Sequence, residues 1–163
     1  MGAFAVTVLV VETHTAEQTQ EFGRRLGSLS DIGSLYLLRG TLGAGKTTLT
    51  QGLAWGAGAM GYAHSPTCVS VKEYAGRFPI YHVDLYRVEG GNLEAHDLGF
   101  EEMLEKGACV VEWPEMAEDI FPGEHLSIHI DFGEGTEDRK LQVQAHGARY
   151  ERLVEDLRRL QAL

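Results

Sequence analysis

A glycine-rich segment that ends in lysine and threonine is the strongest chemical signal in the sequence. Gly40 to Thr47 (GTLGAGKT) fits the pattern G-x-x-x-x-G-K-[ST]. Glycines in this pattern let successive backbone N–H groups turn inward around phosphate oxygens, and the following helix start adds partial positive charge. Lys46 is long enough to reach the β- and γ-phosphates, and the Thr47 hydroxyl suits Mg²⁺, which prefers oxygen ligands. The segment therefore predicts a site for Mg²⁺ and a nucleoside triphosphate.

Such a site needs an acidic side chain to hold Mg²⁺ or a water bound to it, and two residues are candidates. Asp84 and Glu112 each follow a short apolar run that is expected to form a strand. Ligands of doubly wound sheets bind beyond the carboxyl ends of parallel strands. Either acid could therefore face the glycine-rich turn if its strand runs parallel to residues 34–39, and the spacing does not choose between them.

Two further polar groups could act beside these acids. His82, Asp84 and Tyr86 alternate along residues 80–86, so a strand there would place all three side chains on one face. His82 taken alone is more typical of a hydrogen-bonded core histidine than of a catalyst. In residues 65–67 (SPT), the proline disfavours a helical conformation, so two hydroxyls are presented from an extended loop that could sense a γ-phosphate.

The elements that must position these residues alternate along the chain. Apolar and β-branched runs predict strands, whereas apolar residues at helical spacing predict helices, the first of them capped near Thr15. We expect one α/β domain over residues 1–163, of the P-loop NTPase type, with a mixed central sheet (a parallel core with added antiparallel strands) flanked by helices. The predicted strands are 4–11, 34–39, 70–74, 80–86, 109–113, 126–132 and 140–145, and the predicted helices are 16–29, 46–57, 100–106 and 148–160, with a hairpin loop at 133–138.

Composition and charge limit the possible binding partners and the cellular compartment of the protein. The 163 residues carry a net charge of −10, so the chain is not expected to grip nucleic acid strongly by itself. Four C-terminal arginines interleave with acidic residues, which is typical of a solvated helix face. No stretch has the length of a membrane span, the N-terminal apolar run lacks a basic leader, and two cysteines lack redox or metal-ligand spacing. These features predict a cytoplasmic protein without a membrane partner.

Several segments together resemble one known family. In chain order they are residues 40–48 (GTLGAGKTT), 65–67 (SPT), 82–87 (HVDLYR), 98–102 (LGFEE) and 112–115 (EWPE). They are similar to the ATPase component of bacterial threonylcarbamoyladenosine tRNA modification, the TsaE family. The resemblance spans nearly the whole chain. It implies an ATP-hydrolysing subunit that works with TsaB- and TsaD-type partners, resets their complex between turnovers and meets tRNA only through that complex.

The resemblance also implies residue roles. Thr47 and Glu112 would bind Mg²⁺, Asp84 would act near the γ-phosphate or its water, and Thr67 would belong to a switch loop. The segment around Thr15 would close over the base. The implied catalytic residues are Lys46, Thr67, Asp84 and Glu112, and the implied nucleotide-binding residues are Thr15, Leu42, Gly43, Ala44, Gly45, Lys46, Thr47, Thr48, Asp84 and Arg139.

Two other functions remain compatible with a phosphate-binding loop. A small-molecule kinase would transfer the phosphoryl group to an acceptor, but such enzymes usually carry an arginine-bearing lid, and no cluster of arginines occurs between Thr67 and Trp113. A nucleotide-gated binding protein would use ATP to order residues 65–67 and create a partner surface, with hydrolysis only resetting that state. No N-K-x-D segment occurs, which disfavours GTP.

Overall fold

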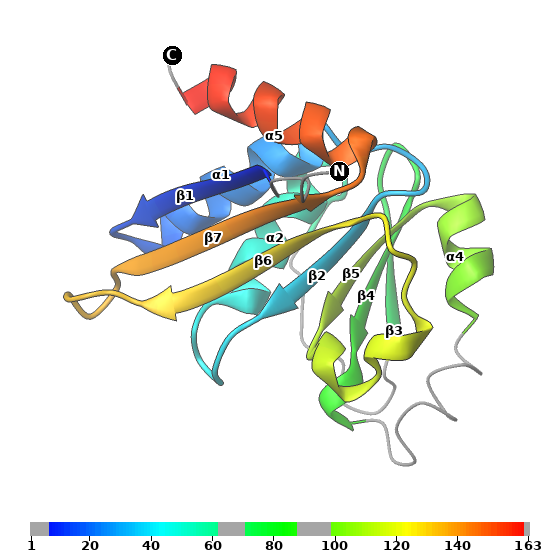
Figure 1. Ribbon diagram of the computed structural model, residues 1–163, viewed down its shortest axis with the longest axis horizontal. Coiled ribbons are helices and arrows are strands. Elements are labelled where there is room, and N and C mark those ends of the chain that lie inside the picture. The colour runs from blue at the N-terminus through cyan, green and yellow to red at the C-terminus, as the bar shows by residue number, and fades with distance from the viewer. Residues whose placement is uncertain (1–6, 62–70, 88–98, 162–163) are drawn as a thin grey trace, which may run out of the picture.

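A computed structural model describes residues 7–61, 71–87 and 99–161 (Figure 1). Strands and helices alternate in the first half, and strands dominate the second, as expected from the sequence. The strands are β1 (Thr7–Thr13), β2 (Leu35–Arg39), β3 (Val71–Ala75), β4 (Pro79–Asp84), β5 (Ala108–Glu112), β6 (His125–Phe132) and β7 (Arg139–His146). The α-helices are α1 (Ala16–Ser28), α2 (Lys46–Gly56), α4 (Phe100–Lys106) and α5 (Ala148–Gln161), and 3₁₀ helices span Leu85–Arg87, Pro114–Met116 and Glu118–Ile120.

The described strands form one mixed seven-stranded sheet in the order β1-β7-β6-β2-β5-β4-β3. The central strands β4, β5, β2 and β6 run parallel to one another. Antiparallel strands complete both edges, β3 beside β4 at one end and β7 and then β1 beside β6 at the other. The predicted fold class is therefore confirmed, and the parallel core brings the carboxyl ends of β2, β4 and β5 to one edge of the sheet.

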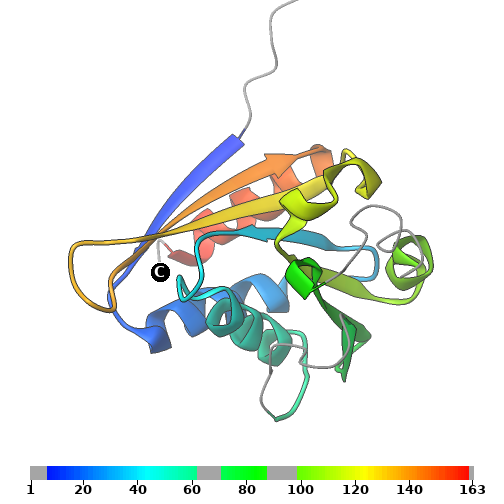
Figure 2. The ribbon, with the colours of Figure 1, turned by 90° about the horizontal axis from the view of Figure 1, so that it is seen from below.

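Both faces of the sheet contribute to the core, because the central strands are buried on both sides. Helices α1, α2 and α5 cover one face, where Tyr36 and Leu38 of β2 contact their apolar side chains. Helix α4 and the segment after β5 cover part of the other face, which holds Leu35, Leu37 and the buried free thiol of Cys109 (Figure 2). In the described part of the chain, no helix combines the length and apolar character needed to cross a bilayer.

Helices α1 and α2 pack through glycines that let their backbones touch. A Cβ added at Gly23 or Gly27 of α1 would lie 2.4 Å from the Leu49 carbonyl oxygen or 2.0 Å from that of Leu53. The reverse holds on α2, where a Cβ at Gly52 would lie 1.9 Å from the Gln20 carbonyl oxygen. Gly56, the last residue of α2, belongs to the same contact, because a Cβ there would lie 2.0 Å from the Arg24 carbonyl oxygen.

Two predicted strands end earlier than expected. The strand predicted over 80–86 ends at Asp84, because the Asp84 carboxylate accepts the Tyr86 backbone N–H at 3.0 Å and the chain turns into a 3₁₀ helix. Tyr86 is therefore not on the strand face that it was predicted to share with His82. The strand predicted to include Trp113 ends at Glu112, because Trp113 has a left-handed backbone with φ of 59°. Strand β1 extends to Thr13, and residues 4–6 lie outside the described residues.

Candidate functional site

The glycine-rich turn joins the carboxyl end of β2 to the first turn of α2. Gly43 and Gly45 have positive φ angles of 82° and 111°, a conformation that residues with a Cβ rarely adopt. A Cβ added at either position would meet no atom within 4 Å, so the backbone of the turn borders open space. Gly45 caps α2 without a side-chain hydrogen bond. An uncapped helix start of this kind directs its first N–H groups toward bound anions in phosphate-binding proteins.

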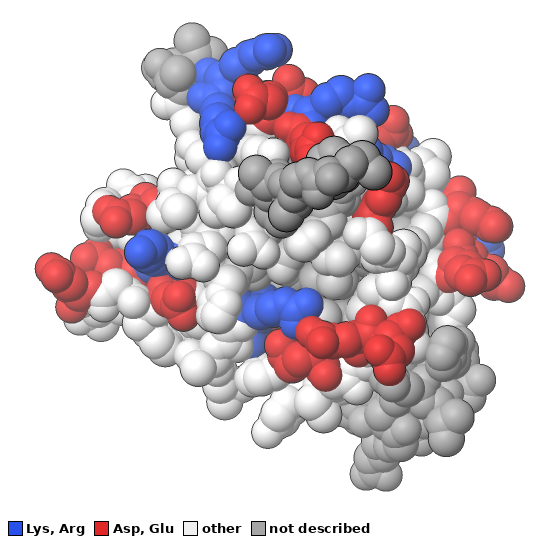
Figure 3. Space-filling view, in the orientation of Figure 1, with Lys and Arg blue, Asp and Glu red and all other residues white. Residues whose placement is uncertain are grey.

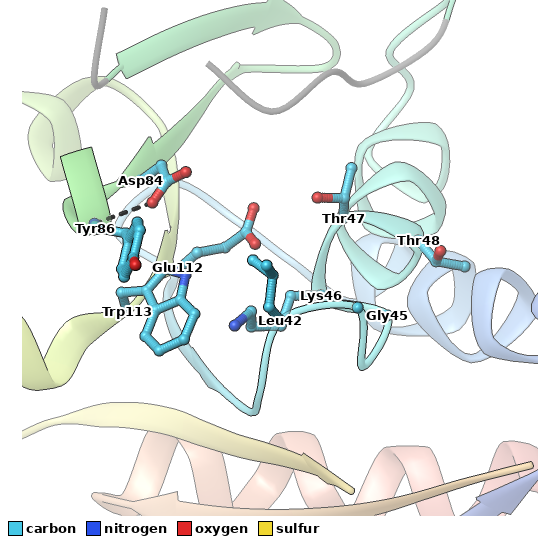
Figure 4. Close-up of a pocket in the computed structure, with 10 residues that line it drawn as sticks. Leu42, Gly45, Lys46, Thr47, Thr48, Asp84, Tyr86, Glu112 and Trp113 are labelled. Atoms are coloured by element: carbon cyan, nitrogen blue, oxygen red, sulfur yellow. Dashed lines mark hydrogen bonds between the residues drawn. The ribbon is translucent and has the colours of Figure 1, made fainter. Parts of the chain in front are cut away.

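A cavity of about 540 Å³ lies against this turn (Figure 4). The turn and α2 form one wall, and residues at the ends of β4 and β5 form the other. Figure 4 shows Asp84, Tyr86, Glu112 and Trp113 on one side and Thr47 and Thr48 on the helix opposite. The lining residues are Leu42, Gly43, Gly45, Lys46, Thr47, Thr48, Asp84, Tyr86, Glu112 and Trp113.

The two candidate acids lie side by side in this cavity. Asp84 and Glu112 are register partners in the parallel pair β4 and β5, and both are largely buried. The sequence required that the strand of each acid run parallel to β2, and β4 and β5 both do so. Both acids therefore lie at the edge of the sheet where β2 ends. Glu112 lies on the strand next to β2, and Asp84 lies one strand further away. Together with the Thr47 hydroxyl, the two carboxylates form a set of oxygen donors suited to a hard cation.

Lys46 enters the same cavity from the first turn of α2. Its ammonium group donates to the Gly40 carbonyl oxygen at 2.5 Å and lies 3.7 Å from the centre of the Trp113 ring. Burial lowers the pKa of Lys46 below its ordinary value, while the negative charges of Glu112, Glu115 and Asp84 oppose this shift. The cavity therefore brings one partly desolvated cation close to two carboxylates.

Comparison with known proteins gives a consistent result. The family model described as "Threonylcarbamoyl adenosine biosynthesis protein TsaE" matches residues 13–141. The chain belongs to the TsaE family. The tRNA threonylcarbamoyladenosine biosynthesis protein TsaE of Bacillus subtilis is 40% identical over 149 residues, covering 90% of this chain and 92% of the relative. The protein of the same name from Streptomyces coelicolor is 39% identical over 137 residues, covering 80% and 93%.

A solved structure agrees in fold along nearly the whole chain. The crystal structure of Bacillus subtilis YdiB superimposes with a TM-score of 0.80 at 34% sequence identity, covering 98% of this chain and 99% of that one. The mixed sheet and its helices are therefore those of a known TsaE-family structure.

Arg139, the first residue of β7, contacts the glycine-rich turn. Its Nε donates to the Ala44 carbonyl oxygen at 2.8 Å, so β7 supports the glycine-rich turn from behind. Its guanidinium group also lies over the Phe132 ring, 4.7 Å from the ring centre. Arg139 borders a cavity of about 90 Å³ that is also lined by Ala16, Thr19, Gly43, Gly45, Thr48 and Glu137.

Thr15 caps the start of α1. Its side-chain oxygen accepts the Gln18 backbone N–H at 3.0 Å, which confirms the predicted cap of α1. Thr15 itself does not line the small cavity, whereas its neighbours Ala16 and Thr19 do. The predicted switch residue Thr67, with the rest of residues 65–67, lies outside the described residues.

Trp113 is the site residue whose importance the sequence did not reveal. The sequence predicted it only as the last residue of a strand, but its ring lies over the Lys46 ammonium group and 4.9 Å from the Tyr86 ring, centre to centre. A bulky residue with positive φ is rare and points to a constraint imposed by its surroundings. The following Pro114 restricts the backbone of Trp113, but nothing in the segment EWPE indicates that the ring would lie over Lys46.

Proposed function

We propose that this chain is a cytoplasmic ATPase subunit that binds ATP with Mg²⁺ and acts in threonylcarbamoyladenosine modification of tRNA. The observation that carries the proposal is the meeting of Lys46, Asp84 and Glu112 in one cavity at the start of α2. The names of the relatives support the biosynthetic setting. TsaB- and TsaD-type subunits would be its partners, and tRNA would be reached through their complex.

The residues of the cavity fit a magnesium nucleotide. Mg²⁺ usually keeps several waters and takes one or two carboxylates together with substrate phosphates. The described residues hold no cluster of three or more histidine, cysteine or acidic side chains that could cage a metal alone. The set formed by Thr47, Glu112 and Asp84 instead suits a cation that is shared with phosphate oxygens. When bound, Mg²⁺ neutralises phosphate charge during transfer.

Each group of the chain would then have one task. Backbone N–H groups of residues 43–47, apart from that of Ala44, which donates to the Thr41 carbonyl oxygen, would hold the phosphates together with the Lys46 ammonium. Glu112 with Thr47 would hold the metal. Asp84 is oriented by the backbone N–H of Tyr86, and it would position the attacking water. The Lys46 ammonium now contacts the Gly40 carbonyl oxygen and the Trp113 ring. A charged phosphate oxygen would bind it more strongly than either of these neutral groups.

Two arginines next to the glycine-rich turn already have partners inside the chain. Arg39 pairs with Glu118 at 2.8 Å and with Glu115 at 3.5 Å, and Arg139 donates to Ala44. We expect a partner subunit to supply additional positive charge at the γ-phosphate. This arrangement predicts slow hydrolysis by the isolated chain and faster hydrolysis in the assembled complex.

The test is ATP hydrolysis with Mg²⁺ by the purified chain, alone and with both partner subunits and tRNA. We expect stimulation on assembly, and Lys46→Ala should lower the rate by about a hundredfold or more. Lys72→Ala is the matched control, because Lys72 is an exposed lysine of β3 that does not line the cavity. A rate that does not rise in the complex would contradict the partner role, and phosphorylation of an added nucleoside would instead indicate a kinase.

A further inference from the structure

His82 lies beneath the candidate metal site in the core of the sheet. Its side chain is fully buried on β4, two residues before Asp84. In the parallel register, His82 is paired with Val110 and Asp84 is paired with Glu112. The Glu112 side chain reaches back by two register pairs, roughly 6.6 Å along the strands, to meet the histidine ring. Nε2 of His82 donates a hydrogen bond to Oε2 of Glu112.

The other ring nitrogen of His82 has no hydrogen-bond partner. Nδ1 is buried and unpaired, and it is the single such side-chain atom found in the described residues. Burying an unpaired polar atom is unfavourable, so an aliphatic side chain would fill this position at least as well for stability alone. The hydrogen bond to Glu112 is therefore the feature that distinguishes histidine from an aliphatic residue at this position.

We propose that His82 is a positioning residue that fixes the Glu112 carboxylate for Mg²⁺. The inference rests on the proposed function, because it assigns a support to one of that site's metal ligands. Hydrogen-bond donors behind a metal-binding carboxylate set its orientation and often matter strongly for metal affinity. With Oε2 held from below by the imidazole, Glu112 presents its carboxylate at the cavity between Asp84 and Thr47, as Figure 4 shows.

A competing partner makes this support necessary. Lys46 lies in the same cavity, close enough for the charge of Glu112 to act on its ammonium group. Without a donor at position 82, the flexible glutamate would be free to turn toward Lys46 and pair with it. Such a pair would take the carboxylate from the metal and the ammonium from the phosphates. His82 keeps the two functions of the cavity apart.

The proposal is tested by the Mg²⁺ dependence of nucleotide binding, measured by calorimetry with ADP at a series of Mg²⁺ concentrations and in EDTA. His82→Leu removes the donor and keeps an apolar filling. We expect the Mg²⁺ concentration for half-maximal enhancement of ADP binding to rise by about 10- to 100-fold. Affinity for ADP in EDTA should stay within about twofold of the wild type, because the phosphate contacts are unchanged.

Two further variants separate positioning from packing. His82→Gln keeps an N–H donor near the place of Nε2 and should restore most of the Mg²⁺ affinity, whereas His82→Asn is too short to reach Glu112 and should not. Val110→Ala removes packing at the register partner of His82 on the same face. It should lower Tm while leaving the Mg²⁺ dependence as in the wild type. The contrast between the glutamine and asparagine variants tests the proposal even if His82→Leu does not fold.

The outcomes have distinct meanings. Wild-type Mg²⁺ dependence in His82→Leu, or equal effects of the glutamine and asparagine variants, would overturn the positioning role and leave the proposed function standing. A Val110→Ala protein that reproduced the magnesium defect would also overturn it, because loose packing would then be the cause. A wild-type chain without any Mg²⁺-dependent ADP binding would overturn the proposed function itself, and the inference with it.

Discussion

At the scale of single residues, the glycine-rich turn depends on side chains that come from distant parts of the sequence. Arg139 holds the Ala44 carbonyl oxygen across 95 positions, and it also bonds to the carbonyl oxygens of Thr136 and Asp138. Trp113 closes over Lys46. The turn would otherwise be a short glycine-containing loop with many accessible conformations. These side chains favour the conformation in which its N–H groups converge.

Arg139→Ala should therefore weaken nucleotide binding without removing a group from the large cavity. A hydrogen bond from a charged donor contributes about 1.5–3 kcal/mol, so we expect an affinity about 10- to 100-fold lower. Arg139→Lys should lie between, because one ammonium group cannot make all three bonds. Titration calorimetry with ADP and Mg²⁺ measures the effect, and Arg152→Ala on the exposed face of α5 is the control. Wild-type affinity in Arg139→Ala would show that the turn is stable without this support.

At the scale of elements, the close contact of α1 and α2 sets the position of the phosphate-binding helix. The glycine pairs Gly23 with Gly27 and Gly52 with Gly56 lie one turn apart on their helices, so each pair faces the partner backbone. Lys46 and Thr47 begin α2, and their place relative to β5 follows from where α1 holds this helix. A larger side chain in the contact would push the helices apart.

Gly52→Ala is expected to destabilise the fold although alanine is the better helix former. Helix propensity favours alanine by about 1 kcal/mol, but the added Cβ would lie 1.9 Å from the Gln20 carbonyl oxygen. Overpacking of this kind should lower the free energy of unfolding by about 3 kcal/mol, or Tm by roughly 10 °C. Urea and thermal unfolding measure it. Gly123→Ala, whose Cβ would meet nothing within 4 Å, should change stability by less than about 0.5 kcal/mol. Equal stability of the two variants would refute the close contact.

At the scale of the whole molecule, positive and negative side chains are mixed on the surface around α5, and the core holds a buried ionisable tyrosine. Arginines of α5 are mixed with acidic side chains on the face shown in Figure 3, and Arg158 pairs with Glu155 at 2.9 Å. This agrees with the predicted solvated helix face. Inside, Tyr36 of β2 is fully buried and its hydroxyl bonds to Ser30 just after α1. Because Ser30 donates to the Leu26 carbonyl oxygen, the tyrosine is the donor in that bond.

Tyr36 should make the fold sensitive to alkali. Burial raises the pKa of Tyr36 from 10.0 to about 12, so the folded state keeps a proton that the unfolded chain loses. Its contribution to stability is complete below pH 10 and is lost between about pH 10 and 12. We expect Tyr36→Phe to lower stability by about 1 kcal/mol at pH 8. At pH 11 this difference should vanish, because the wild type alone loses about 1.4 kcal/mol through this group. Urea unfolding at both pH values checks this, and a constant difference would contradict it.

The sequence by itself determined the features that depend on local pattern. The glycine-rich turn between a buried strand and a helix, the cap at Thr15 and the hairpin loop at 133–138 follow from residue types at short spacing, since local backbone geometry depends on near neighbours. Apolar runs likewise predicted the strands, apart from the early ends at Asp84 and Glu112. The two acids were identified as candidates because each ends such a run.

Tertiary structure alone decided which of these residues meet. Both Asp84 and Glu112 face the turn because β2, β5 and β4 are parallel neighbours, and strand order is not written in any local pattern. The ring of Trp113 over Lys46, the bond from His82 to Glu112 and the support of Ala44 by Arg139 join positions 30 to 95 residues apart. Such contacts arise only when the sheet and its helices pack together, because packing rather than spacing sets the distance between side chains on different elements.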